Sequence, residues 1–260
     1  MRLPLYQVDA FADRLFTGNP AAVVPLEQWL PEPLMQSIAM ENNLSETAFI
    51  VRQGQGWGIR WFTPTGEIDL CGHATLASAF VITAFIDPQA TELLFHTKVA
   101  GDLRVSRDGD LYTLDFPTRA PAPATAPADL LRALGGPDPV EVLAARDWFI
   151  VYPDAAAVRG LTPDFALLSA IAGKVIVTAP GEDVDFVSRF FAPAEGIPED
   201  PVTGSAHCSL IPYWAARLGR DGLEARQLSA RGGRLHCRLL GERVHIAGRG
   251  VLYLEGAIHV

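Results

Sequence analysis

Two short segments place a glycine directly before a polar residue and an apolar run, an order that is typical of a helix start. Gly72 precedes H-A-T-L-A, and Gly204 precedes S-A-H-C-S. The first turn of a helix carries unpaired N–H groups and a partial positive charge, so it can hold a carboxylate or stabilise an enolate-like charge. One such glycine alone indicates only a tight turn. Two of them with matched polar neighbours favour a substrate-binding role for Gly72 and Gly204.

Titratable side chains lie beside both glycines and before a predicted strand. Glu46 stands directly before the apolar run A-F-I, where a carboxylate is partly removed from water and suited to proton transfer. His73 follows Gly72, and an imidazole there can titrate near neutral pH. In the acidic turn before Gly204, Asp200 is suited to cap the helix or to hold a substrate amine or hydroxyl.

The sequence contains three cysteines, too few and odd in number for a disulfide framework, and no C-x-x-C pair that would suggest a zinc ribbon. Cys71 directly precedes Gly72, where a helix start lowers the pKa of a thiol and activates it. Cys208 lies inside the second predicted helix and is interpreted as a small core residue. His207, one turn into that helix, is interpreted as structural.

The elements that must position these residues occur twice. R-W-F-T-P at 60–64 and R-F-F-A-P at 189–193 start 129 residues apart, close to half of the chain. Each copy is followed by an acidic turn, a glycine and an apolar helical run. This order indicates an internal duplication. We expect two α+β halves, each with strands wrapped around one buried helix, because the alternation is too irregular for a doubly wound parallel sheet.

Periodicity predicts the individual elements. The predicted helices cover 32–42, 74–86 (buried on all sides), 126–134 and 205–218. The predicted strands cover 3–9, 20–25, 47–52, 57–63, 92–99, 103–107, 111–116, 147–152 and 174–178, with further strands between 225 and 260. Proline marks 117–128 as a linker. The predicted domains are therefore 1–116 and 117–260, unless the last strand returns to the first domain.

Composition restricts the class of protein. The chain has 260 residues, 49% of them hydrophobic, and a net charge of −9, a profile that is typical of a soluble globular protein. The acidic balance argues against nucleic acid or a membrane surface as a partner and leaves a small anionic substrate open. The longest apolar run, around 76–86, is too short to span a bilayer, and the N-terminus lacks the apolar core of a signal peptide. We expect a cytoplasmic protein.

Four motifs carry a family resemblance. They are F-T-G-N-P-A-A-V (16–23), N-N-L-S-E-T-A-F (42–49), F-T-P with C-G-H-A-T (62–75) and E-D-P-V-T-G-S-A (199–206). In this order, and across both halves, they resemble the PhzF or phenazine biosynthesis-like family. The resemblance implies a diaminopimelate epimerase-like fold, with two similar domains that each wrap sheet strands around a central helix. It further implies a pseudo-twofold relation between the domains, an active site in the cleft between them, and a homodimer.

The resemblance also implies a function. The characterised family member is an isomerase that acts on dihydro-hydroxyanthranilate by acid–base chemistry, without a cofactor or a metal. The matching glutamate, Glu46, would take a proton from one carbon of a small carboxylate-bearing substrate and return it to another. The other matching residues would orient the substrate or relay protons: His73, Asp200 and Ser205. Asn19 lies in a loop that resembles a substrate-contacting segment of the wider superfamily.

Two alternatives stay open. Related epimerases and racemases use two opposing cysteines, and Cys71 occupies the first of those positions. The second position falls near Asp200, where there is no cysteine, so a two-thiol racemase is disfavoured. An amino- or hydroxy-acid epimerase that pairs Cys71 with Glu46 or Asp200 is one alternative. A non-catalytic small-molecule binding protein of the same fold is the other.

Overall fold

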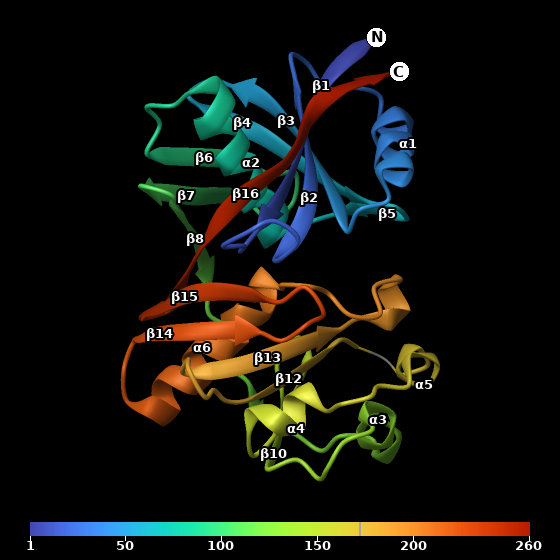
Figure 1. Cartoon of the computed structure of the whole chain (residues 1–260), viewed down its shortest axis with the longest axis vertical. Helices are drawn as coiled ribbons and strands as arrows, with labels where there is room; N and C mark the ends of the chain where they lie inside the picture. Colours follow the sequence, from blue (N-terminus) through green and yellow to red (C-terminus); the bar gives the residue numbers. More distant parts are fainter. Residues whose placement is uncertain (172) are drawn as a thin grey trace. The chain divides into compact units, whose positions relative to one another are not determined.

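The computed structural model describes residues 1–171 and 173–260 and divides into two compact units (Figure 1). The first unit comprises Met1–Asp115 and Ala247–Val260, and the second comprises Phe116–Ile246. The last strand, β16 (Arg243–His259), begins in the second unit and continues into the first, where it pairs with the first strand of the chain. The second unit therefore ends at Ile246 and not at the C-terminus.

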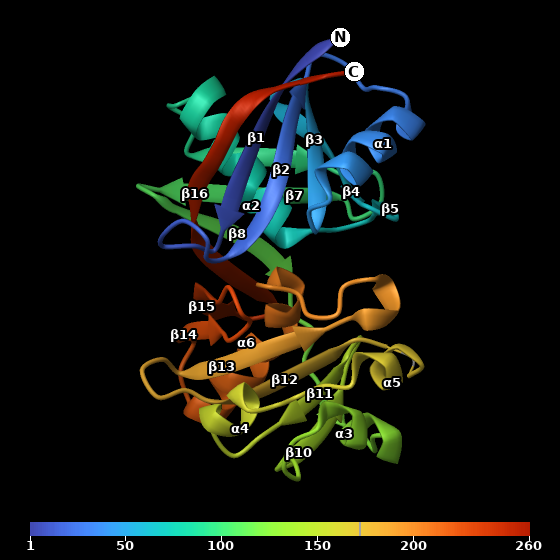
Figure 2. The same cartoon turned by 45° about the vertical axis from the view of Figure 1, so that its right-hand side comes forward.

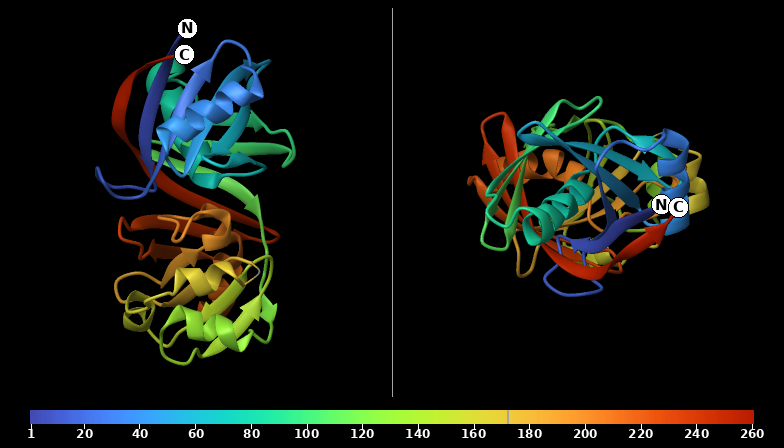
Figure 3. Two further views of the ribbon diagram at one scale, coloured as in Figure 1. Left: turned by 90° about the vertical axis from the view of Figure 1, so that its right-hand side faces the viewer. Right: turned by 90° about the horizontal axis from the view of Figure 1, so that it is seen from above.

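The first unit is a sheet closed into a barrel. Its elements are β1 (Arg2–Ala10), β2 (Asn19–Leu26), α1 (Glu32–Asn42), β3 (Glu46–Gln53), β4 (Gly56–Thr63), β5 (Gly66–Ile68), α2 (Gly72–Val81), β6 (Glu92–His96), β7 (Asp102–Asp108) and β8 (Leu111–Pro117). The strand order is β1-β2-β3-β4-β6-β7-β8-β16, and β16 closes the circle by pairing with β1. The two termini lie next to each other, as Figure 3 shows.

Helix α2 lies inside this barrel, which the view from above in Figure 3 shows. Its sequence, G-H-A-T-L-A-S-A-F-V, offers small or apolar side chains on all sides, and all of them except Phe80 are buried. The helix starts two residues before the predicted position and passes into a π-helical turn, Ile82–Ile86. Phe85 and Ile86 in that turn are 38% and 43% exposed, so the prediction of burial on all sides is wrong for the last turn.

Helix α1, predicted with the observed bounds, covers the outer face of β3 and β4 (Figure 2). Met35 and Ile38 of this helix pack with Phe49, Val51 and Phe62 from the strands. Strand β3 is thus buried on both faces over its first six residues, which explains its continuous apolar run. Strands β3 and β4, predicted at 47–52 and 57–63, pair as an antiparallel hairpin in which Gln53 lies opposite Gly56.

The second unit also surrounds one long helix. Its elements are β9 (Ala122–Pro123), α3 (Ala128–Leu134), β10 (Glu141–Ala144), β11 (Trp148–Val151), α4 (Ala155–Arg159), α5 (Phe165–Ser169), β12 (Val175–Pro180), β13 (Phe186–Phe191), α6 (Gly204–Leu218), β14 (Gly222–Gln227) and β15 (Gly233–Leu240). The strand order is β16-β15-β14-β13-β12-β11-β10-β9, and α6 packs on β14 and β15. The proline-rich segment 117–128, predicted as a linker, contains β9, which pairs with β10.

The same strand pattern occurs in both units. From β1 through β2, β3, β4 and β6 to β7, successive pairs are antiparallel, parallel, antiparallel, parallel and antiparallel. From β10 through β11, β12, β13 and β14 to β15, the pairs follow the same series. The two R-x-F-x-P segments lie on the equivalent strands β4 and β13. The predicted duplication is therefore present in the fold.

The arginine that opens each R-x-F-x-P segment has the same partners in the two units. Arg60 binds Glu67 with two hydrogen bonds of 2.6 Å, and Arg189 binds Glu199 with bonds of 2.7 and 3.0 Å. Each guanidinium also lies over the phenylalanine ring two residues further along its strand, at 5.2 and 5.0 Å. These pairs fix the acidic turn before each central helix to the strand beneath it.

Among the residues described, no helix is both long enough and apolar enough to cross a membrane.

Candidate active site

The first unit brings four of the predicted site residues into one buried cluster: Asn19, Glu46, Cys71 and His73. Asn19 and Glu46 are the first residues of β2 and β3, which run parallel, so both strand starts lie at the same edge of the sheet. Cys71 is the N-cap of α2, and His73 lies in its first turn. The starts of β2, β3 and α2 therefore lie close together.

Glu46 and His73 form the centre of this cluster. The Nε2 atom of His73 lies 2.9 Å from Oε2 of Glu46, and the two side chains are only 5% and 8% exposed. The approach lacks the geometry of a hydrogen bond, and neither atom has another hydrogen-bond partner in the described structure. Leaving a buried polar group unsatisfied costs about 1–3 kcal/mol, so such a group in a folded protein calls for an explanation. Both atoms are therefore available to a ligand.

The second ring nitrogen of His73 contacts two neighbours. Its Nδ1 atom lies 3.1 Å from Nδ2 of Asn19 and 3.4 Å from Sγ of Cys71. These contacts fix the ring so that Nε2 faces Glu46. Burial lowers the pKa of His73, but its contacts with Cys71 and Glu46 outweigh burial and raise it well above its ordinary value.

Cys71 is a neutral thiol at neutral pH. Burial, followed by the charge of Glu46, raises its pKa to about 11, against the opposing effects of His73 and of the Ala74 N–H group. The prediction that the helix start activates this thiol is therefore wrong, because removal from water outweighs the helix dipole. It follows that Glu46, and not a thiolate, is the negative charge beside His73 at neutral pH.

Both predicted glycines open a central helix. Gly72 and Gly204 are the first residues of α2 and α6, and the N-caps Cys71 and Thr203 have extended backbones. Neither N-cap side chain makes a capping hydrogen bond to its own helix. The N–H groups in the first turn of each helix can therefore donate hydrogen bonds to a substrate carboxylate.

Asp200, in the second unit, lies three residues before Thr203, the N-cap of α6. Its carboxylate accepts a hydrogen bond from the Thr203 hydroxyl, and Thr203 is the N-cap. Gln227 of β14 supports both residues, because its Nε2 donates to the Asp200 carbonyl and its Oε1 accepts from the Thr203 N–H, each at 2.8 Å. Asp200 is therefore a buried carboxylate with a fixed position. Gln227 was missed because it lies in an ordinary strand pattern.

Ser205, in the first turn of α6, contacts a residue that sequence reasoning also missed. Its Oγ lies 3.2 Å from Nη2 of Arg146, and the same guanidinium is paired with Asp147 at 3.0 Å. A cation at a helix N-terminus is unfavourable by itself. The carboxylate of Asp147 already balances this cation. Arg146 lies in the turn between β10 and β11, and no motif in the sequence marks it.

His207 and Cys208 have the structural roles that were predicted. His207 is fully buried, its Nδ1 hydrogen-bonds the Thr203 carbonyl at 2.9 Å, and burial lowers its pKa to about 4. It is therefore a neutral core histidine. Cys208 is 3% exposed, and all three cysteines are free and buried.

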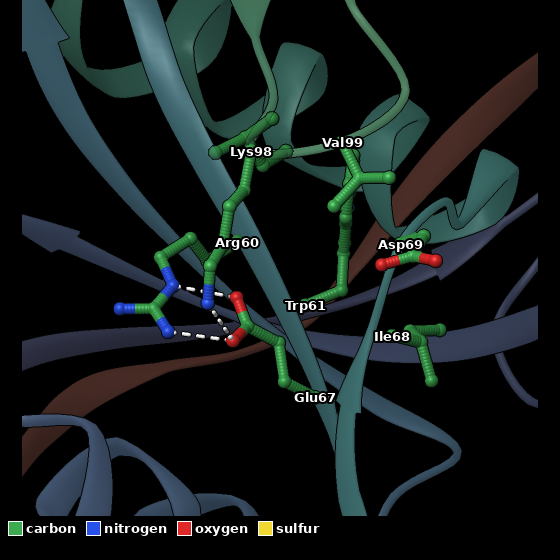
Figure 4. Close-up of a pocket in the computed structure, with 8 residues that line it drawn as sticks. Arg60, Trp61, Glu67, Ile68, Asp69, Lys98 and Val99 are labelled. Carbon is green, nitrogen blue, oxygen red and sulfur yellow. Dashed lines mark hydrogen bonds and ion pairs between the residues drawn. The ribbon is translucent and has the colours of Figure 1, made fainter.

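A shallow pocket in the first unit, shown in Figure 4, contains none of the predicted site residues. It is lined by residues of β4, of β5 and of the segment after β6, among them Arg60, Trp61, Glu67, Asp69 and Lys98. The Arg60–Glu67 pair and a 3.2 Å contact from Lys98 to Glu67 hold the segment that leads from β5 to Cys71. The two ion pairs of Glu67 therefore help to position the start of α2.

Comparison with known proteins places the chain among relatives. A family model described as "Phenazine biosynthesis-like protein" matches residues 8–256. The chain is 54% identical to the uncharacterized isomerase PA3578 of Pseudomonas aeruginosa over 262 residues, which cover 100% of both chains. A PhzF-family crystal structure from Enterococcus faecalis superposes with a TM-score of 0.97 at 49% identity, again over 100% of both chains.

More distant likeness extends to the epimerases. A hydroxyproline epimerase from Agrobacterium vitis superposes with a TM-score of 0.61 at 14% identity, over 99% of this chain and 92% of that one. At this identity the likeness concerns the fold alone. The predicted epimerase-like fold class, with two similar domains that each wrap strands around a central helix, is confirmed.

Proposed function

The chain belongs to the PhzC-PhzF family of phenazine biosynthesis-like proteins, and we propose that it is an isomerase that moves a proton within a small carboxylate-bearing substrate, with Glu46 as general acid and base. The observation that carries this proposal is the buried contact between Glu46 and His73, in which each side chain presents an unsatisfied atom.

The chemistry follows from the charges of this pair. The Glu46 carboxylate takes a proton from a carbon adjacent to the unsaturated system of the substrate, and the bonding electrons move into the substrate as an enolate-like charge. The protonated ring of His73 balances this negative charge. Glu46 then returns the proton to a second carbon, so atoms and charge balance. Low exposure of the carboxylate keeps the proton from bulk water between the two steps.

A carboxylate-bearing substrate agrees with the polar groups of both units. The start of α2 offers N–H groups beside His73, and the start of α6 offers N–H groups beside the Ser205 hydroxyl, which contacts the Arg146–Asp147 ion pair. We propose that Asp200 and Ser205 orient the substrate and that Asn19 holds His73 in place. That both units contribute to one substrate site remains a prediction of the sequence.

The Cys71-based epimerase has less support. A racemising thiol must be deprotonated to act as a base, and burial raises the pKa of Cys71 to about 11. A protein that only binds a small molecule does not need a buried carboxylate with an unsatisfied oxygen, so the binding-protein alternative also has less support.

Deuterium exchange tests the proposal. The protein is mixed in deuterated water with dihydro-hydroxyanthranilate and with a panel of cyclic and unsaturated carboxylic acids, and deuterium entering each carbon is followed by NMR. Glu46→Gln is expected to lose about 100-fold or more of the exchange rate while it still binds the acid. Glu41→Gln, which changes an exposed glutamate of the same unit, is the matched control. Full exchange by Glu46→Gln contradicts the proposal, and an acid that binds without exchange favours the binding protein.

A further inference from the structure

Three side chains at the catalytic cluster together form a metal-ligand set. Glu46, Cys71 and His73 each offer one ligand atom, and these atoms all lie within 4.8 Å of one another. A tetrahedral zinc ion binds sulfur, nitrogen and oxygen ligands at about 2.0–2.3 Å. Small movements of the three side chains would bring their ligand atoms to these distances from one ion. The proposed mechanism uses Glu46 and His73 but gives Cys71 no part in the proton transfer.

A second observation shows that the set is open to a ligand. Oε2 of Glu46 and Nε2 of His73 are buried without a hydrogen-bond partner in the described structure, although they lie 2.9 Å apart. A buried carboxylate oxygen and a buried ring nitrogen that face each other in this way are satisfied either by a shared proton or by a cation. The residues themselves are 6% and 4% exposed, so water screens such a cation little.

We propose that Glu46, Cys71 and His73 bind a single Zn²⁺ ion and that this ion inhibits the enzyme. Thiolate, imidazole and carboxylate are the ligands that zinc takes in proteins, and three protein ligands leave its fourth position to water or to a substrate oxygen. The inhibitory part rests on the proposed function, because zinc occupies the Glu46 oxygen that would take the proton and the His73 nitrogen whose positive charge would balance the enolate-like charge. The binding part stands independently of it.

Binding is balanced by the release of protons. Zinc displaces the proton of the Cys71 thiol and forms a zinc–thiolate bond, and it also displaces the proton on Nε2 of His73, which then ligates through that nitrogen. No oxidant or reductant takes part. Asn19, which contacts Nδ1 of His73, stands where it can orient the ring toward the ion.

Cobalt(II) serves as the spectroscopic probe for this site. Titration of the full-length protein with Co²⁺ is expected to give one equivalent of bound metal, a thiolate-to-cobalt charge-transfer absorption and the visible bands of a tetrahedral ion, all of which Zn²⁺ removes. Cys71→Ser is expected to lose the charge-transfer absorption. Cys237→Ser, at a buried cysteine in β15, is the matched control and keeps it. Glu46→Gln is expected to keep the absorption and to bind about tenfold or more weakly.

A measurement on the unaltered protein guards against a variant that fails to fold. X-ray absorption of the zinc-loaded protein is expected to show one sulfur neighbour at about 2.3 Å with nitrogen or oxygen neighbours at about 2.0–2.2 Å. Zinc without a sulfur neighbour, or a charge-transfer absorption that survives in Cys71→Ser, overturns the site. If the cobalt spectrum is as expected but zinc leaves proton exchange unchanged, the site stands and its inhibitory role, together with the assignment of Glu46 as the acid/base, is contradicted.

Discussion

The Nε2 atom of His73 lies 2.9 Å from Oε2 of Glu46, and this contact joins the start of strand β3 to the start of helix α2 inside the first unit. Neither Oε2 of Glu46 nor Nε2 of His73 has a hydrogen-bond partner in the described structure. The contact places the positive ring of His73 beside Glu46 and still allows the carboxylate to bind a proton. A carboxylate in this setting can accept a proton from carbon and hold it.

Replacement of His73 tests the role of that positive neighbour. We expect His73→Asn to lower kcat by about 100-fold or more, because the enolate-like charge loses its balancing imidazolium. Steady-state kinetics with an acid that the wild-type protein isomerises would measure the effect. His96→Asn is the control, since His96 is a partly exposed histidine of the same unit that pairs with Asp102. Equal losses in the two variants, or none in His73→Asn, would remove His73 from the mechanism.

Replacement of Cys71 separates the proton-shift mechanism from the thiol-based epimerase. We expect Cys71→Ala to lower kcat by less than about tenfold, because a buried thiol with a pKa of about 11 is not the base and acts only through its contact with His73. The same kinetic assay, run beside His73→Asn, gives the comparison. A loss in Cys71→Ala as large as that in His73→Asn would support the epimerase alternative instead.

The position of this site could be predicted in part from the sequence. The glycines before two apolar runs located both helix starts, and the repeated R-x-F-x-P segment located the duplication. The position of Glu46 before an apolar run indicates a partly buried carboxylate, but only the family resemblance assigns a proton-transfer role to this one of the 30 acidic residues. The thiol state of Cys71 was mispredicted because the helix dipole is visible in a sequence whereas the degree of burial is not.

The Arg189–Glu199 pair offers a test of stability. Arg189 is 11% exposed, binds Glu199 with two bonds and donates to the carbonyls of Val158 and Leu161 at 3.2 and 2.9 Å. We expect Arg189→Met to lower the free energy of unfolding by about 3 kcal/mol, because it leaves a half-buried carboxylate and two carbonyls unpaired. Arg234→Met, which removes an exposed pair with Glu224, is expected to lower it by less than about 1 kcal/mol. Urea denaturation measures both, and equal effects would contradict the anchoring role of Arg189.

The buried His207 predicts how stability depends on pH. Its pKa is lowered from 6.5 to about 4 in the folded chain, so between these values the unfolded chain binds the extra proton. This residue therefore destabilises the fold by up to about 3 kcal/mol as pH falls from about 6.5 to about 4 and has no such effect above that range. Unfolding free energies across this range should vary less steeply in His207→Gln. His259→Gln, at an exposed histidine, should keep the wild-type slope, and an unchanged slope in His207→Gln would contradict the prediction.

Several parts of the fold lay beyond sequence reasoning. Strand β5 and helices α4 and α5 have three to five residues each, too few for a hydrophobic period to be visible. The N-caps of α4 and α5 are Asp154 and Asp164, whose carboxylates accept hydrogen bonds from the N–H groups of Ala157 and Leu167, a local signal that could have been used. Arg146 and Gln227 could not have been found in this way, because their partners are set by tertiary contacts.

In the proposed reaction, one buried carboxylate both removes and returns the same proton. Dihydro-hydroxyanthranilate, or the acid that the exchange panel identifies, is deuterated at the carbon that loses its proton, and a single turnover is followed in ordinary water by mass spectrometry. We expect a measurable fraction of the product to carry the deuterium at the receiving carbon, because Glu46 is only 6% exposed and exchanges slowly with water. A product that contains only solvent hydrogen at that carbon, from the first turnover on, would contradict a single shuttling carboxylate.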